Sequence, residues 1–332
     1  MTKRRALLRV LGAGVLSAAA WPTRGQQTSK IPRVALLFFG TRARNASYDE
    51  PARFRARLSE LGYVEGKNVV IEERYAEGNT QRLNELAREL VEAKVDVIVA
   101  SAVAATMAAR HATGTIPIVM VHAGNAASAV STGLITSLAQ PGGNVTGTTN
   151  ITFGGKHVDL IRELIPRVTK LAILNNPTNA GAASYVASVT DAASRSNIGV
   201  IVTDVTRAED FPNAFTTLRN ARPDGLVVAV EPLIGAHSAE VIDFAATTRL
   251  PAIYDFGEMA RRGGFIAYAT VYIEHYALAA DYVDKILKGA KPGDLPVQQP
   301  ARFELVINLK TAKALGLTIP QSLLLRADEV IN

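Results

Sequence analysis

Ser101 is the residue whose surroundings point most directly to chemistry. The apolar run of residues 97–99 precedes it and has the pattern of a strand buried on both faces of a parallel sheet. Residues 104–110 follow it and are helix formers, so Ser101 lies where a strand ends and a helix begins. Free backbone N–H groups and the helix dipole favour a carboxylate or another anion at such a turn. We therefore predict that Ser101 binds a ligand, and an ordinary helix N-cap is the alternative.

Two other predicted strands of the first half, residues 33–40 and 117–121, lead into glycine and other small residues, at positions 40–41 and 123–125. Small residues let a ligand approach the backbone closely. The carboxyl ends of parallel strands meet at one edge of a sheet, which is where open α/β sheets bind ligands. The predicted binding residues of this half are Phe39, Gly40, Thr41, Ser101, Ala102, Gly124 and Asn125.

The second half of the chain has polar or aromatic residues at its predicted strand ends. Solvation at the rim of a cleft is the alternative role for Glu231, and packing near a hinge is the alternative for Tyr268. The predicted binding residues of this half are Asn175, Glu231, Tyr254, Asp255 and Tyr268.

Strand and helix patterns alternate along the chain, and the alternation starts a second time near residue 155. Such alternation predicts parallel, right-handed doubly wound sheets, so we expect an α/β fold with two lobes. Lobe 1 is predicted to contain residues 31–149 and 270–299, and lobe 2 residues 150–269 and 300–332. Within lobe 1, residues 134–138 are predicted to be helical.

The composition is typical of a globular protein. The chain has 332 residues, 48% of them hydrophobic and 20% charged, which is enough for two domains. The formal net charge of +6 comes almost entirely from basic residues in the first 27 positions, so no basic stripe remains for nucleic acid. The sequence has no cysteine, which excludes disulfides, thiol catalysis and cysteine-ligated metal sites.

Residues 1–27 have the pattern of an export signal. Basic residues come first, and an apolar run follows that is too short to span a bilayer as a mature helix. The order of Lys3, Arg4 and Arg5 before apolar residues resembles a twin-arginine signal, with Leu7 where phenylalanine is commoner. We therefore expect export of the folded protein to the periplasm, and an uncleaved N-terminal anchor is the alternative.

The sequence lacks the common motifs of cofactor-dependent and hydrolytic enzymes. No Gly-x-Gly-x-x-Gly follows the first strand, and there is no Walker motif and no Gly-x-Ser-x-Gly elbow. The five histidines are scattered without metal-ligand spacing. We expect a binding protein that is not an enzyme and that uses no cofactor or metal. The alternatives are a two-lobed enzyme, such as a racemase or hydrolase, and a ligand-sensing module for a membrane sensor.

Segments from nearly the whole chain after the signal resemble one protein family. They are FRARLSELGYVEGKNVVIEERYAEGN, LVEAKVDVIVASAVAA, SLAQPGGNVTGTTN, YVDKILKGAKPGDLPVQQP and FELVINLKTAKALGLTIPQSLLLRADEVI. They look like the tryptophan-binding-like solute-binding proteins of ABC importers. The resemblance implies a type I periplasmic-binding-protein fold with three interlobe crossings and the ligand in the cleft. It also implies an amino acid, an aromatic acid or a similar small ligand, with a membrane permease as partner. We expect the protein to be a monomer.

One position departs from the pattern of this family. Members often carry Asp-Pro after the fourth strand, where this chain has Asn125 and Ala126. An amide at this place cannot pair with the ammonium group of a ligand as a carboxylate can. We therefore expect the first lobe to bind a carboxylate group of the ligand. Any cationic group of the ligand is expected at Glu231 or Asp255 of the second lobe.

Overall fold

The computed structural model of the chain describes residues 30–42, 50–179, 181–229 and 231–332. The chain divides into two units, residues 1–30 and 31–332, and every helix and strand below belongs to the second. The predicted export signal lies outside the described residues. Within the described ranges, each helix is too short or too polar to span a bilayer.

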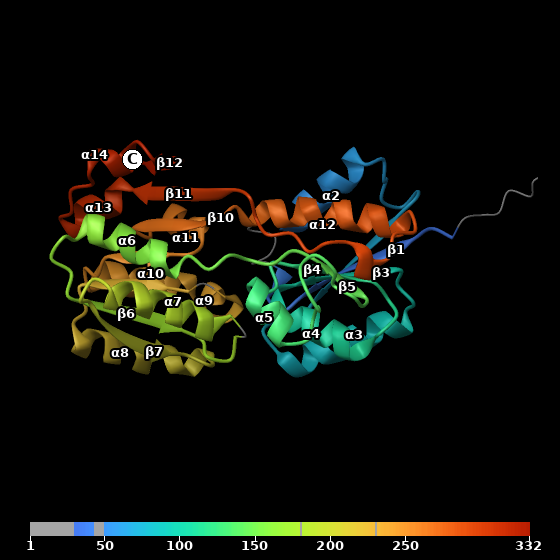
Figure 1. The fold of residues 1–332 in the computed structure, drawn as a ribbon, viewed down its shortest axis with the longest axis horizontal. Coiled ribbons are helices and arrows are strands. Elements are labelled where there is room, and N and C mark those ends of the chain that lie inside the picture. The colour runs from blue at the N-terminus through green and yellow to red at the C-terminus, as the bar shows by residue number, and fades with distance from the viewer. Residues whose placement is uncertain (1–29, 43–49, 180, 230) are drawn as a thin grey trace, which may run out of the picture. The chain divides into compact units, whose positions relative to one another are not determined.

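The first half of the chain forms a five-stranded parallel sheet with the order β2-β1-β3-β4-β5 (Figure 1). Its strands are β1 (Arg33–Phe38), β2 (Val70–Tyr75), β3 (Val97–Ser101), β4 (Ile118–Val121) and β5 (Val145–Gly147).

Helices cover both faces of this sheet. Successive side chains of a strand point to opposite faces, so Ala35 and Leu37 of β1 pack on one side and Val34 and Leu36 on the other. The apolar faces of α3 and α4 complete the first layer, and those of α2 and α12 complete the second. Burial on both faces explains the continuous apolar strand sequences. The helices of this half are α2 (Glu50–Glu60), α3 (Thr80–Glu92), α4 (Ala102–Ala112), α5 (Ala126–Ser131) and α12 (Tyr272–Leu287).

The second half forms a seven-stranded sheet with the order β12-β11-β10-β9-β8-β6-β7. All neighbouring strands are parallel except β10 and β11, which run antiparallel. The expected doubly wound sheet is therefore mixed at one pair of strands. Its strands are β6 (Lys170–Asn175), β7 (Gly199–Asp204), β8 (Gly225–Val228), β9 (Ala252–Tyr254), β10 (Ile266–Thr270), β11 (Phe303–Asn308) and β12 (Glu329–Ile331).

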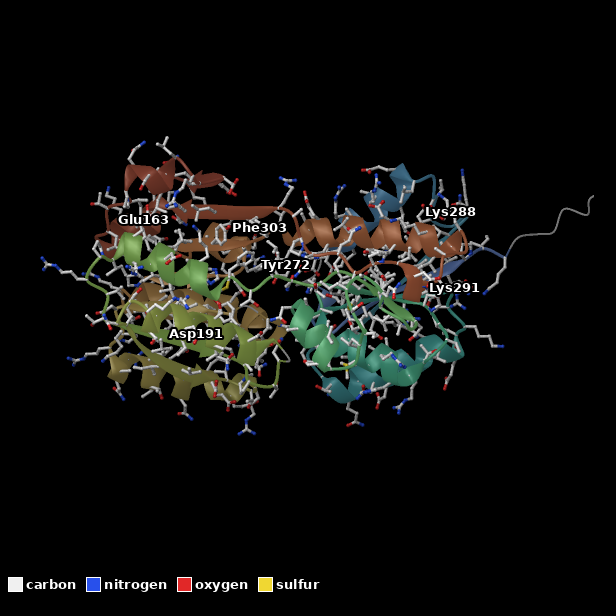
Figure 2. All side chains as sticks on the ribbon, viewed as in Figure 1. Glu163, Asp191, Tyr272, Lys288, Lys291 and Phe303 are labelled. Atoms are coloured by element: carbon white, nitrogen blue, oxygen red, sulfur yellow. The ribbon has the colours of Figure 1, made fainter. Side chains whose placement is uncertain are left out.

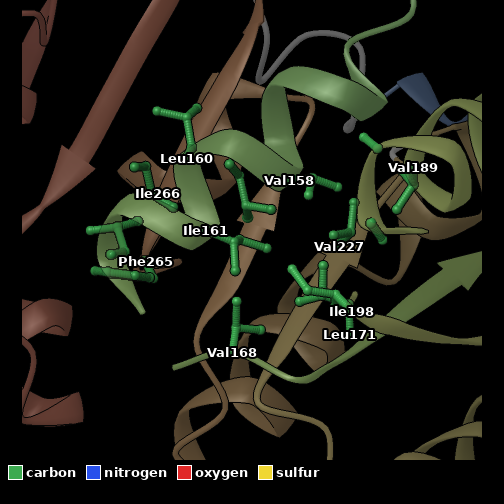
Figure 3. Packing of buried hydrophobic residues seen from close by; sticks show 14 of the residues in the cluster. Val158, Leu160, Ile161, Val168, Leu171, Val189, Ile198, Val227, Phe265 and Ile266 are labelled. Atoms are coloured by element: carbon green, nitrogen blue, oxygen red, sulfur yellow. The ribbon is translucent and has the colours of Figure 1, made fainter. Parts of the chain in front are cut away.

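Two apolar layers also enclose this second sheet. Leu171 and Ile173 of β6 pack with α6 and α7, in the layer drawn in Figure 3, whereas Leu174 packs with α8 and α10 on the other face. The helices are α6 (Gly154–Leu164), α7 (Ala182–Ser194), α8 (Phe211–Ala221), α9 (Pro232–Ala236), α10 (Ser238–Thr247), α11 (Gly257–Arg261), α13 (Leu309–Leu315) and α14 (Gln321–Leu324), with 3-10 turns η1 (Ala208–Asp210) and η2 (Pro292–Asp294).

The chain passes between the two sheets three times: between β5 and α6, between β10 and α12, and before β11. Aromatic rings in or next to these passages pack together. The ring centroid of Phe153 lies 5.1 Å from that of Tyr268 and 5.2 Å from that of Phe303, which Figure 2 labels. Thr148 and Gln298 form a bridge that joins the first and third passages. We call Phe153, Tyr268 and Phe303 the hinge cluster.

The helix predicted over residues 134–138 is wrong, because this segment is irregular and contains only bends. Helix α5 ends before it, and Gly133 adopts a left-handed conformation with φ 71°. Leu134 N and Ile135 N still bond back to Ala129 O of α5, but beyond them Thr136 N donates to Pro141 O and Leu138 O accepts from Val297 N, so no new helix turn forms. The short apolar run after α5 therefore forms a loop, which packs against the later chain segment at Val297.

Candidate functional site

A large cavity lies at the carboxyl ends of strands from both sheets. It contains about 1160 Å³ of empty space, part of which is open to solvent. Its walls include residues directly after β1, β3 and β4 of the first sheet and after β6, β8 and β9 of the second. Such strand ends are the usual binding place of open α/β sheets, and the space suits a small organic molecule.

Most of the predicted binding residues line this cavity. The lining includes Phe39, Gly40, Ser101, Ala102, Gly124, Asn125, Asn175, Glu231 and Asp255. These residues come from six strand ends that are far apart in the sequence, and the topology of the two sheets brings them together.

Thr41, Tyr254 and Tyr268 do not line the cavity. Tyr254 ends β9 with its side chain fully buried in the apolar layer that includes α10, whereas the next residue, Asp255, lines the cavity. This difference follows from the alternation of side chains along a strand. Tyr268 packs in the hinge cluster, which is the role expected as its alternative.

The backbone at the cavity edge is unusual at three positions. Ala102 has φ 66°, His122 φ 42° and Gly124 φ 63°, all in the left-handed region. A Cβ atom at Gly124 would lie 2.3 Å from Ser128 Oγ, so only glycine fits there without a shift. Left-handed alanine and histidine cost free energy that the surrounding structure must offset, and such residues concentrate at functional sites.

The hydroxyl of Ser101 belongs to a buried chain of polar side chains. Ser101 occupies the N-cap position of α4, but its hydroxyl accepts no hydrogen bond from a backbone N–H of that helix. The alternative prediction, that the Ser101 side chain caps the helix, is therefore wrong. Its Oγ lies 2.8 Å from Tyr276 Oη and 3.2 Å from His122 Nε2. Tyr276 gives its single hydroxyl proton to Glu50 over 3.1 Å, so Ser101 must donate to Tyr276. The Ser101 oxygen then accepts from His122 Nε2–H.

Asn125 uses both ends of its amide within the protein. Its Oδ1 accepts from Ser128 N over 2.8 Å and caps helix α5. Its Nδ2 donates to Thr152 Oγ1 on the first passage and to Ser184 Oγ on α7. Asn125 therefore joins the first half of the chain to the second across the cavity.

Glu231 caps a helix with the carboxylate that faces the cavity. Its Oε1 accepts from Ile234 N over 2.7 Å and caps α9, and its Oε2 accepts from Asn176 Nδ2 over 3.0 Å. The residue is partly buried and lines the cavity, so its charge acts on anything bound there.

Tyr185 on α7 connects the cavity wall to the hinge cluster. Its hydroxyl lies 2.6 Å from His157 Nδ1, and His157 Nε2 lies 2.8 Å from the carbonyl oxygen of Tyr268. Burial lowers the pKa of His157 to about 4. Burial, together with the charge of Asp255, raises the pKa of Tyr185 well above its usual value.

The charged side chains on the described cavity walls are all acidic. They are Glu50, Glu231 and Asp255. His122 also lines the cavity, and no lysine or arginine lines the described walls. No group of His, Cys, Asp or Glu within the described ranges is placed to hold a metal ion. The described walls can therefore form an ion pair with a cationic group of a ligand, whereas an anionic group would be bound by neutral hydrogen-bond donors.

Sequence reasoning missed Glu50, His122, Tyr185, Tyr272 and Tyr276. Glu50 begins the helix after the first strand, and an acid in a first helical turn was a usable signal. His122 directly follows β4, which was also visible in the pattern. Tyr185 lies inside a helix, and Tyr272 and Tyr276 lie on α12, so no local pattern could place them beside the strand ends.

Comparison with known proteins gives one consistent family. The model of the family "ABC transporter substrate binding protein" matches residues 45–331. A curated relative, the "Tyrosine-binding protein" of Clostridioides difficile (strain R20291), is 28% identical over 264 residues, which is 80% of this chain and 75% of that protein.

Solved structures agree with this match. A conserved domain protein from Vibrio cholerae has a TM-score of 0.85 at 28% identity, covering 91% of this chain and 100% of that chain. The ABC domain in complex with L-Trp from Streptococcus pneumoniae has a TM-score of 0.84 at 24% identity, covering 90% and 99%. These similarities confirm the resemblance and the predicted type I periplasmic-binding-protein fold. The family is a non-enzymatic binding component, which confirms the prediction that the chain is not an enzyme.

Proposed function

The chain belongs to the family of ABC transporter substrate binding proteins, and on this premise we propose that it captures a small organic solute and delivers it to a membrane permease for import. The observation that carries the proposal is a cavity lined by strand ends from both sheets. A solute bound there contacts both halves of the chain at once. It can therefore stabilise one closed arrangement of the two halves.

We propose an amino acid, or an aromatic acid or similar molecule, as the ligand. Aromatic side chains supply apolar surface in the cavity, with Phe39, Phe153 and Phe256 among them. Backbone N–H groups at the start of α4 are suited to the ligand carboxylate, and Glu231 and Asp255 to a cationic group. The names of two similar proteins, a tyrosine-binding protein and a domain in complex with L-Trp, support this class.

The proposed mechanism is hinge closure. Lobe 1 is assigned residues 31–149 and 270–299, lobe 2 residues 150–269 and 300–332, and the three passages between them form the hinge. The hinge cluster holds one ring from the first passage and one from each of β10 and β11, the strands that border the other two passages. Small dihedral changes there move the lobes as bodies. The cross-cavity bond from Asn125 to Ser184 is one that closure would form and opening would break.

Residues 1–27 are proposed to export the folded protein through a twin-arginine signal. Solute-binding proteins of this family are typically periplasmic, which supports the same location. There the mature protein is proposed to act as a monomer that docks on its permease.

A binding screen tests the proposal. Purified protein is heated with L-tyrosine, L-tryptophan and 3-(4-hydroxyphenyl)propanoate in separate thermal-shift experiments. A true ligand at about a hundred times its dissociation constant should stabilise the native state by ~2.7 kcal/mol. Uptake of the radiolabelled ligand should then fall in cells that lack the protein and return when it is supplied. Tight binding in vitro with unchanged uptake would contradict the transport role.

A further inference from the structure

We infer that Asn125 and Ser184 form a latch between the two lobes that needs no solute, so that it keeps part of the free receptor closed and sets the affinity for every solute alike. The latch rests on the proposed hinge closure, and it adds the contact that balances the free protein between its open and closed arrangements. Asn125 follows β4 of the first sheet, and Ser184 lies on α7 of the second half, 59 residues further along the chain.

The Asn125 amide is held with its two hydrogens directed at the second half of the chain. Its Oδ1 accepts from Ser128 N over 2.8 Å and caps α5, which fixes Nδ2 as the end that faces the second half. One amide hydrogen is donated to Thr152 Oγ1 over 3.0 Å and the other to Ser184 Oγ. Both hydrogens are therefore used within the protein.

The Ser184 hydroxyl is oriented to accept this bond. It donates its own proton to Gly181 O over 2.9 Å, so its oxygen presents lone pairs to Asn125. The next residue, Tyr185, and Val189 anchor α7 in the buried apolar layer of the second sheet. Ser184 itself does not line the described cavity walls. The chain therefore supplies both sides of the bond, and the bond can form without a solute.

The two partners of Asn125 should respond differently when the lobes open. Thr152 lies on the first passage, next to Phe153 of the hinge cluster, so it moves little relative to Asn125. Ser184 lies on a helix that moves with the second lobe. Only the bond to Ser184 therefore distinguishes the closed arrangement from the open one.

The strength of one neutral hydrogen bond sets the size of the effect. Such a bond changes the ratio of closed to open protein roughly threefold to tenfold. A solute that requires the closed arrangement has an apparent dissociation constant that rises as the closed fraction falls. Because Ser184 does not line the cavity, the latch should change this constant by the same factor for every solute.

The test measures the closed fraction of the free protein directly. Spin labels at Val130→Cys on α5 and Val202→Cys on β7, two exposed positions, report the distance between the lobes by pulsed electron–electron double resonance. The closed component is recognised by the distance between these positions in the structure, where the latch is formed. The variants are Ser184→Ala and Asn125→Ser; the new serine can keep the cap of α5 but is too short to reach α7.

Ser188→Ala is the matched control. Ser188 lies one turn later on α7 and is half-buried like Ser184. Its hydroxyl oxygen accepts from Gly155 N of α6 over 3.1 Å, so its bond stays within the second half of the chain. Calorimetry with L-tyrosine and with 3-(4-hydroxyphenyl)propanoate gives the dissociation constants of the same variants.

We expect Ser184→Ala to lower the ratio of closed to open free protein roughly threefold to tenfold, and to raise the dissociation constants of both probes by up to that factor. Adding Ser184→Ala to Asn125→Ser should have no further effect, because the bond is already absent. Ser188→Ala should leave the ratio unchanged.

An unchanged closed component in Ser184→Ala, or an equal loss in Ser188→Ala, overturns the latch and leaves closure around a solute standing. A free wild-type protein without the closed component also overturns it, as does a Ser184→Ala variant that weakens one probe only. An unchanged distance distribution of the wild type at saturation with L-tyrosine instead contradicts the proposed hinge closure. If neither probe binds, the proposed ligand class fails, and the distances in the free protein still decide whether the latch exists.

Discussion

Replacing Glu231 by glutamine removes one negative charge from the cavity and keeps the shape of the side chain. The carboxylate accepts from Ile234 N over 2.7 Å and from Asn176 Nδ2 over 3.0 Å. A glutamine carbonyl can keep the helix cap, so the main local loss is the hydrogen bond from Asn176 Nδ2 to the carboxylate. Since a hydrogen bond to a charged group is lost, we expect the free energy of unfolding to fall by about 1.5–3 kcal/mol.

The effect on binding should depend on the ligand. A hydrogen bond to a charged group is worth about 1.5–3 kcal/mol. The dissociation constant of L-tyrosine should therefore increase by a factor between roughly ten and a little more than a hundred. A simple carboxylate such as 3-(4-hydroxyphenyl)propanoate should bind Glu231→Gln as well as wild type or slightly better, because a like charge is removed.

Calorimetry with both ligands, together with urea unfolding, separates these two effects. Glu163→Gln is the matched control, because Glu163 (labelled in Figure 2) also accepts two hydrogen bonds, from Ser322 and Arg326, and does not line the cavity. If Glu231→Gln leaves the affinities of every bound ligand unchanged, Glu231 is only a helix cap and the assignment of the cationic group is wrong.

Four further outcomes are expected. Ser101→Ala should lower the free energy of unfolding by about 1–2 kcal/mol and change the ligand affinity less, since the Ser101 hydroxyl proton is already donated within the protein. If calorimetry shows a larger loss of binding free energy than of stability, the hydroxyl binds the ligand. Gly124→Ala should cost about 1–2 kcal/mol in urea unfolding, because φ is 63° and the new Cβ meets a side chain. Asn125→Asp keeps the cap of α5 but loses the amide donor across the cavity, so it should weaken a simple acid more than an amino acid in calorimetry. Burial lowers the pKa of both His157 and His275 from 6.5 to about 4. Between pH 6.5 and 4, these histidines are therefore protonated in the unfolded state but still neutral in the folded state. The free energy of unfolding should therefore fall by about 3 kcal/mol per histidine from pH 6.5 to 4, and His157→Gln should show the shallower slope.

The fold was largely predictable because its strands are buried on both faces. Such strands are continuous apolar runs, as in β1 and β3, and their alternation with helices fixes two doubly wound sheets. The antiparallel pairing of β11 depends on a late return of the chain from the other sheet, and no local pattern encodes it. The bends at residues 134–138 likewise depend on bonds to Pro141 and Val297.

The candidate site was predictable where it consists of strand ends. Topology alone places Gly40, Ser101 and Asn175 at sheet edges, and all three line the cavity. The direction of a side chain was harder to predict, since Tyr254 and Asp255 are adjacent and only Asp255 reaches the cavity. Contributions from helices, such as Tyr185 on α7, require the packing of whole elements, and a single sequence does not contain that information.

The most direct test of hinge closure is the distance between the two lobes, measured with and without ligand. The chain has no cysteine, so Val130→Cys on α5 and Val202→Cys on β7, both at exposed positions, give two unique sites for spin labels. Pulsed electron–electron double resonance then records the distribution of distances between the two labels in the free protein and at saturating ligand. Hinge closure predicts a broad distribution that becomes one narrow, shifted peak when the solute identified in the screen is added. An unchanged distribution at full calorimetric saturation would contradict closure around a ligand held between the lobes.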